Sequence, residues 1–145
     1  MKIKLIFFLI LVPFIAIAHE VNIEDKNVEQ IVKERMSKMS KIKAFSATMY
    51  PLIISGEFVE IKEYNEKLLH NAKEFKHLFP EGSQGGKASS IIWEDRETFD
   101  LYNDNFINSI ESISTSIENE DSVSLMENFT IMTSNCGTCH KKFKN

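Results

Sequence analysis

The chain has 145 residues, a formal net charge of −4 and 43% hydrophobic residues. A chain of this length forms one domain around a single core. The weak acidity argues against nucleic acid as a partner, because nucleic-acid sites are basic. Composition therefore limits the chain to a small globular protein, and its class has to be argued from local patterns.

The first eighteen residues have the layout of a secretory signal peptide. Lys2 and Lys4 precede an apolar run from Leu5 to Ile15 that only Pro13 interrupts, and Ala16-Ile17-Ala18 supplies the small residues of a cleavage site. A membrane anchor would need about 20 apolar residues, but polar residues follow at once. We therefore expect residues 1–18 to be removed on export to the periplasm. Residues 19–145 then form the mature chain, with a formal charge of −6 and no membrane span.

Glycine and proline are scarce, and the windows between them space their apolar residues as helices do. Four helices are expected, at about residues 28–49, 57–79, 91–117 and 121–143. In the second window apolar residues recur at alternating steps of three and four, which is typical of a helix packed nearly parallel to its neighbours. Short links join the first and last pairs, and a longer link lies between them. The pattern predicts an all-α fold, an antiparallel four-helix bundle.

The last window contains Cys136-Gly137-Thr138-Cys139-His140, and CxxCH is the attachment signature of c-type haem. Two thiols form thioethers with the haem vinyl groups, and the histidine supplies an axial nitrogen to the iron. Cys136 and His140 are four residues apart and share one helix face. We predict one covalently bound haem c per chain, attached through Cys136 and Cys139, with His140 as an axial iron ligand.

Other uses of two cysteines remain as alternatives. An exported protein often joins two cysteines in a disulfide. A redox-active pair of thioredoxin type should follow a strand and begin a helix, whereas this motif lies near a predicted helix end. A structural zinc site usually needs four Cys or His ligands, and only three are local. A dithiol oxidoreductase without haem is the alternative that predicts no haem in the purified protein.

Beyond the haem motif, the mature sequence resembles the class II cytochromes c, the cytochrome c prime family. The resemblance includes Arg35 with Met39 four residues later, the loop Phe79-Pro80-Glu81-Gly82-Ser83, and the segment Ile92-Trp93-Glu94-Asp95 that leads to Phe99. It implies a four-helix bundle with the haem on its last helix, Met39 on the distal side of the haem, and Arg35 beside a haem propionate. An unpaired inward charge would otherwise be costly.

Within this family, methionine at the distal position implies the low-spin branch, because a thioether is a soft ligand that leaves no vacancy on the iron. The leading expectation is a periplasmic one-electron carrier, not an enzyme. Its six-coordinate low-spin haem would be ligated by His140 and Met39, and it would serve redox partner proteins. The alternative is a five-coordinate cytochrome c prime that binds nitric oxide or carbon monoxide, with Met39 off the iron. Met36 is the nearest competitor as a ligand.

Three further features complete the expectations. Many relatives carry arginine four residues after the haem histidine, whereas Lys144 keeps the charge but lacks the planar fork, which puts proximal gas binding in doubt. His70 and His77 should lie on the surface. Family members are often homodimers packed through their first two helices, so a homodimer stays open, although outward residues such as Lys33 and Lys62 do not form an apolar interface.

Overall fold

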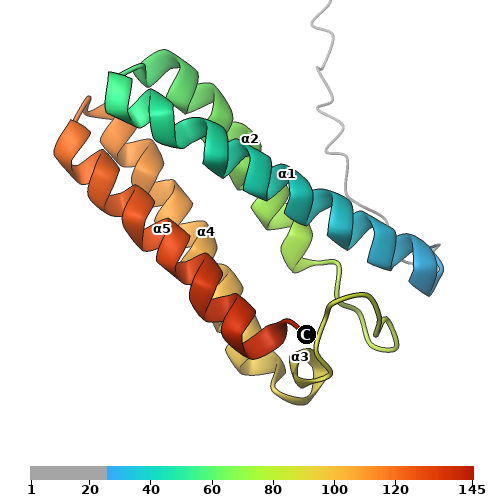
Figure 1. Ribbon diagram of the computed structural model, residues 1–145. Helices are drawn as coiled ribbons and strands as arrows, with labels where there is room; N and C mark the ends of the chain where they lie inside the picture. The colour runs from blue at the N-terminus through green and yellow to red at the C-terminus, as the bar shows by residue number, and fades with distance from the viewer. Residues whose placement is uncertain (1–25) are drawn as a thin grey trace, which may run out of the picture.

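A computed structural model describes residues 26–145, which form an all-helical fold. The helices are α1 (Val28–Ser55), α2 (Phe58–Lys76), α3 (Ile91–Glu94), α4 (Arg96–Glu118) and α5 (Ser122–Phe143). The pairs α1/α2 and α4/α5 are antiparallel hairpins, and α2 packs on α4 (Figure 1). The predicted four-helix bundle is confirmed, with α3 as a short additional turn. The predicted signal peptide, residues 1–18, lies outside the described residues.

Capping residues explain where the long helices begin and end. Asn27 Oδ1 accepts a hydrogen bond from the Gln30 amide at 2.9 Å, and Gln30 Oε1 accepts one from the Asn27 amide at 2.9 Å. This reciprocal capping box satisfies two free donors at the start of α1. Gly56, at φ 76°, ends α1 in the left-handed conformation that glycine favours. Asp121 Oδ1 accepts from two amides in the first turn of α5, both at 3.1 Å.

Helix α1 is longer than its sequence pattern predicts. The cluster of Pro51 and Gly56 suggested an end near residue 49, yet the helix continues to Ser55. Proline removes one amide donor and leaves the carbonyl four residues earlier without its helical partner. That carbonyl belongs to Ala47, and both Ala47 and Pro51 are exposed, so water can bond it. Beyond the proline, buried Ile53 adds a core contact.

The third predicted helix is divided in two at Asp95. This residue has φ −126° and ψ 60°, which is not helical, and its carboxylate accepts from the Thr98 amide at 3.4 Å. Asp95 thereby caps α4, and the residues before it form α3. The second predicted helix also ends early, at Lys76, so Phe79 belongs to the loop that follows α2.

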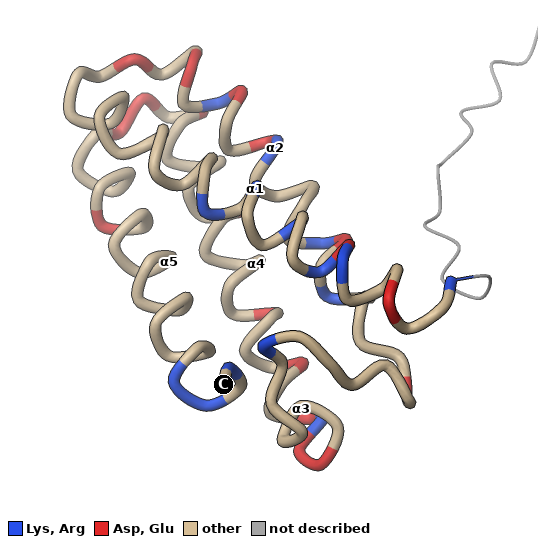
Figure 2. The backbone as a smooth tube through the Cα atoms, turned by 45° about the vertical axis from the view of Figure 1, so that its right-hand side comes forward, with Lys and Arg blue, Asp and Glu red and all other residues tan. Residues whose placement is uncertain are grey.

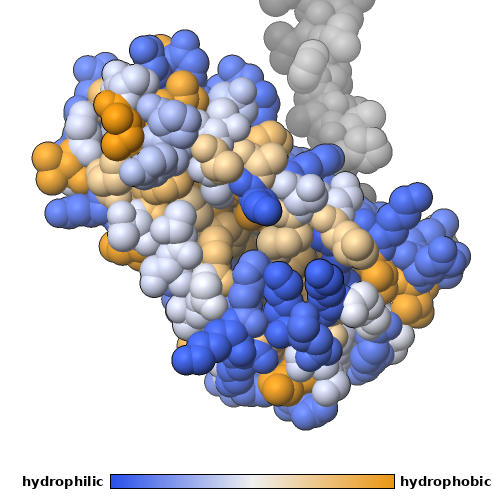
Figure 3. Space-filling view, viewed as in Figure 1, coloured by the Kyte–Doolittle hydropathy of each residue, from blue (hydrophilic) through white to orange (hydrophobic). Residues whose placement is uncertain are grey.

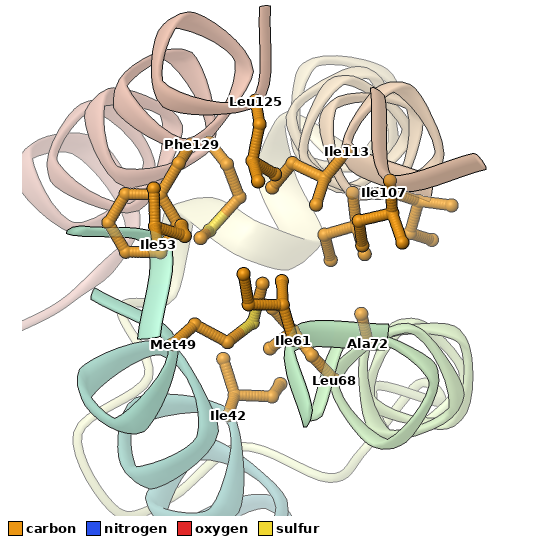
Figure 4. Close-up of a cluster of buried hydrophobic side chains, with 13 residues drawn as sticks. Ile42, Met49, Ile53, Ile61, Leu68, Ala72, Ile107, Ile113, Leu125 and Phe129 are labelled. Atoms are coloured by element: carbon orange, nitrogen blue, oxygen red, sulfur yellow. The ribbon is translucent and has the colours of Figure 1, made fainter. Parts of the chain in front are cut away.

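Buried apolar side chains form two clusters. The central cluster fills the space between the four long helices (Figure 4) and consists of Ile42, Met49, Ile53, Ile61, Leu68, Ala72, Ile107, Ile110, Ile113, Ile117, Leu125, Phe129 and Met132. The aromatic cluster lies at the end of α5 and consists of Leu78, Phe79, Ile92, Phe99 and Phe143. Its rings meet edge to face, with centroids 4.7 Å apart for Phe79 and Phe99, the arrangement that aromatic quadrupoles prefer.

Helices α1 and α5 meet over only a short stretch, whereas each hairpin packs along its length. The two hairpins diverge toward the C-terminal end of α5 (Figure 1). Apolar side chains line the strip between α1 and α5, as the space-filling view from the same side shows (Figure 3). Among residues 26–145, no helix has the length and apolarity needed to cross a bilayer.

Leu68→Ala should destabilise the bundle by about 2–5 kcal/mol, because it opens a cavity where the leucine is fully buried. Leu101→Ala is the matched control, since that leucine is 55% exposed and should change stability by about 0.5 kcal/mol or less. Urea denaturation of both variants measures the difference. Equal losses for the two leucines would contradict this packing.

Candidate haem-attachment site

The CxxCH motif occupies the last turns of α5. Cys136 and Cys139 are both half-buried free thiols. Cys136 packs against the central cluster and Cys139 against the aromatic cluster. His140 follows on the same helix and is half-buried. The motif therefore lies where the two clusters meet, with both thiols in contact with the protein interior.

Burial shifts the pKa of each titratable side chain in the motif. Burial raises the pKa of Cys136, and burial together with the neighbouring Cys136 raises the pKa of Cys139 to about 11. A redox-active dithiol needs a lowered thiol pKa, so these thiols do not fit the haem-free oxidoreductase. Burial, with the positive charge of Lys144, lowers the pKa of His140. Its neutral imidazole is the form that ligates a metal.

Arg35, on α1, is buried at 5% exposure. Its Nη2 donates to the carbonyl oxygen of Ser83 and, at 2.9 Å, to the Ser83 hydroxyl. The guanidinium carbon lies 4.6 Å from the centroid of the Phe79 ring and 5.6 Å from that of Trp93, within the range of a cation–π contact. Arg35 thus joins α1 to the loop that follows α2.

Arg35 is nevertheless incompletely satisfied. Its Nε and Nη1 are buried and have no hydrogen-bond partner, and no carboxylate among the described residues pairs with it. A buried charge with unpaired donors is costly. Burial also lowers the pKa of Arg35. A carboxylate such as a haem propionate would supply the missing acceptor, so the residues present fit the predicted cofactor.

Met39 lies one helical turn after Arg35 on α1. Its side chain is half-buried and packs against the central cluster. Met36, the competing methionine, is 60% exposed and is not among the side chains that pack against that cluster. The structure thus favours Met39 over Met36 as the methionine nearest the interior, although packing in a core does not by itself make a thioether an iron ligand.

The loop between α2 and α3 is held by a second set of contacts. Sequence patterns did not reveal these contacts. Trp93 Nε1 donates to the Pro80 carbonyl at 3.0 Å, and Arg96 Nη1 donates to the Phe79 carbonyl at 2.7 Å. With Arg35, three side chains from three helices bond this loop. The partners are 13 to 48 residues apart in sequence, so no local spacing could indicate them.

Other candidate sites are weaker. His70 and His77 are exposed, as predicted. Among residues 26–145, no three His, Cys, Asp or Glu side chains gather as metal ligands, which weighs against the zinc alternative. A surface depression of about 400 Å³ lies between the start of α1 and the loop at Pro80 to Ser83, and no residue of the CxxCH motif lines it. The candidate haem site is therefore defined by the cysteines and histidine of the CxxCH motif and not by this depression.

A helical bundle with a CxxCH motif on its last helix is typical of a bundle cytochrome. The sequence matches the family model described as Cytochrome C' over residues 30–144. The chain therefore belongs to the cytochrome c prime family, and it binds one covalent c-type haem with its iron. A comparison with curated proteins returned no significant match.

Solved structures of cytochrome c prime from Alcaligenes xylosoxidans are similar over the bundle. The recombinant native protein has 25% identity and a TM-score of 0.78, covering 84% of this chain and 99% of its own. A leucine-to-alanine variant in complex with nitric oxide has 25% identity and a TM-score of 0.78, covering 84% and 98%. A ferrous arginine-to-lysine variant with bound nitric oxide has 25% identity and a TM-score of 0.80, covering 84% and 98%.

The comparisons contradict the expected six-coordinate electron carrier. Cytochromes c prime are typically five-coordinate, and similar structures hold nitric oxide, which favours the gas-binding alternative. The narrower assignment to a low-spin branch with Met39 as sixth ligand has no support. The physical reason is that a methionine on an inward stripe serves as packing more often than as a ligand, and Met39 does pack against the central cluster.

Ser83→Ala should destabilise the protein by about 1–3 kcal/mol, because the buried hydroxyl accepts from Arg35 and donates to the Pro80 carbonyl at 2.7 Å. Exposed Ser90, whose side chain makes no capping bond, provides the control variant Ser90→Ala. Thermal unfolding followed by circular dichroism compares them. If both variants unfold like the wild type, the Ser83 hydroxyl does not help to hold the loop.

Proposed function

We propose that the protein binds nitric oxide or carbon monoxide at an open position on a haem c iron. Cys136 and Cys139 would attach the haem, and His140 would ligate the iron. The observation that carries the proposal is the likeness, at 25% identity over 84% of the chain, to cytochrome c prime structures with bound nitric oxide. When bound, the haem supplies an iron whose free coordination position takes a diatomic gas.

The surrounding residues have separate roles in this proposal. Burial and the charge of Lys144 lower the pKa of His140, which favours the neutral imidazole that would ligate the iron. Arg35 offers two buried donors that lack acceptors and would orient a propionate. Met39 contributes an apolar side chain from α1, and we assign it to the distal wall, where its bulk would restrict the size of a bound ligand. These roles describe binding and need no distal acid or base.

We place this activity in the periplasm, with residues 1–18 as the export signal. The lysines followed by an apolar run and an A-x-A site support export, and covalent attachment of haem c fits the same compartment, in which members of the family occur. Family members are often dimeric, but Lys33 and Lys62, exposed on α1 and α2, argue against an apolar dimer interface in this protein. A redox protein that reduces the iron is the expected heterologous partner.

The double variant Cys136→Ser/Cys139→Ser should contain no covalent haem, because both thioether positions are lost. Mass spectrometry of the denatured protein, expressed with haem-maturation machinery, measures attachment. Met36→Leu is the control and should retain one haem per chain, since this methionine is 60% exposed. Haem that stays covalently bound to the double variant would show that other residues attach it.

Ferrous wild-type protein should bind carbon monoxide promptly, and Met39→Leu should change the affinity by less than about tenfold, or 1.4 kcal/mol. The reason is that Met39, as a wall residue, need not leave the iron before the gas binds. Absorption spectra during a carbon monoxide titration measure both affinities. A wild type that fails to bind, beside a Met39→Leu variant that binds tightly, would contradict the open position.

A further inference from the structure

Charge is unevenly distributed along the bundle. Acidic residues gather at the end formed by the α1–α2 and α4–α5 turns, while lysines gather around the C-terminal end of α5 (Figure 2). The exposed acids at the turn end are Glu57, Glu60, Glu63, Glu66, Glu118, Glu120 and Asp121. The end that carries CxxCH therefore presents a local cluster of lysines, with the acidic residues of α3 and the start of α4 beside it (Figure 2).

The C-terminal lysine patch consists of Lys87, Lys141, Lys142 and Lys144. Backbone contacts fix these residues near one another, because the Asn145 amide donates to the Lys87 carbonyl at 3.0 Å and residues 88 and 144 form an antiparallel bridge. Hydrophilic side chains accordingly cover this end of α5 in the space-filling view (Figure 3). The patch is a defined surface rather than a set of scattered lysines.

Most of the patch charge is available to a partner. Lys142 bonds Asp95 at 2.7 Å, but Lys87, Lys141 and Lys144 are exposed and form no ion pair with any residue between 26 and 145. Lys141 and Lys144 lie within one helical turn of His140, the proposed iron ligand. A molecule bound at this patch would thus sit beside the haem attachment site.

We propose that the C-terminal lysine patch docks the acidic face of a partner protein that reduces the haem iron. One electron would leave the partner's redox centre and convert the ferric iron to ferrous, without any bond broken or proton moved. The exposed acids at the turn end of the bundle would repel the same partner, which favours its approach at the lysine patch. This inference rests on the family's haem and not on gas binding.

A protein partner fits this surface better than an anionic membrane. Membrane-surface helices combine basic residues with a broad exposed apolar face, whereas the exposed large apolar residue near this patch in sequence, Ile91, is only 37% exposed. Each lysine near an anionic bilayer contributes about 1 kcal/mol, which gives weak attachment for three unpaired lysines. An acidic protein, in contrast, needs only local charge complementarity to gain in association rate.

The test follows reduction of the ferric holoprotein by reduced plant-type ferredoxin, an acidic protein of low potential, as ionic strength is raised. Net charge alone predicts a rate that rises with salt, since two acidic proteins repel. Docking at the patch predicts the opposite salt dependence, a rate that falls as salt is added. The reason is that salt screens the local attraction, with a Debye length of about 10 Å at 0.1 M. A rate that rises with salt would overturn the proposal.

Matched double variants separate the patch from total charge. Lys141→Gln/Lys144→Gln should slow reduction at low salt by about threefold or more. Lys43→Gln/Lys62→Gln removes two exposed, unpaired lysines elsewhere and should change the rate less than twofold, as bulk charge alone would. Equal slowing by the two variants would overturn the docking site.

Binding gives a readout that does not depend on electron transfer. Titration with oxidised ferredoxin should shift the amide resonances of residues 87 and 140–145, and the patch variant should lose those shifts. Sedimentation with vesicles of phosphatidylcholine and phosphatidylglycerol tests the membrane. Vesicle binding that needs Lys141 and Lys144, with no effect of these lysines on ferredoxin, would overturn the proposal in favour of a lipid surface. Failure of gas binding would leave both readouts unchanged.

Discussion

The rest of the site depends on α5 remaining helical to its last turn. Cys136, Cys139 and His140 hold their relative positions only while the backbone between them keeps its helical rise and turn. Two contacts secure this end of the helix. Phe143 is buried in the aromatic cluster, 5.3 Å from the Phe99 ring, and its carbonyl accepts from the Ser89 amide at 3.0 Å.

The loop between α2 and α3 links this helix end to α1. It pairs with the C-terminus near Lys144 on one side and bonds Arg35 through Ser83 on the other. Gly85 and Gly86 pass so close to α1 that a Cβ on either would come within 3.1 Å of Val32. The loop therefore contacts both the helix that carries the cysteines and the helix that carries Arg35 and Met39. These contacts fix the position of the one helix relative to the other.

Much of the fold follows from local sequence patterns, because helical periodicity and caps act within a few residues. The bundle, the N-cap at residue 121 or 122 and the exposed positions of His70 and His77 were predicted on that basis. The hydrogen bond between Arg35 and Ser83 was not predicted, because the two residues are 48 positions apart in the sequence. The continuation of α1 through Pro51 was also missed, because it depends on which side of the helix faces water.

The role of Met39 could not be predicted from the sequence pattern alone. The same thioether on the same helical stripe suits a core position and an iron ligand, and helical spacing is identical for both. The comparison with the family favours gas binding over electron transfer, although the position of Met39 in the helix is as predicted. By contrast, the two unpaired nitrogens of Arg35 became visible only with the three-dimensional packing, and they agree with a carboxylate-bearing cofactor.

An electron paramagnetic resonance spectrum of the ferric holoprotein tests the central claim most directly, because it reports the ligand field at the iron. An iron held by His140 alone among the side chains should give a high-spin signal. The account would be contradicted by an entirely low-spin spectrum that becomes high-spin in Met39→Leu, since that result would place the thioether on the iron.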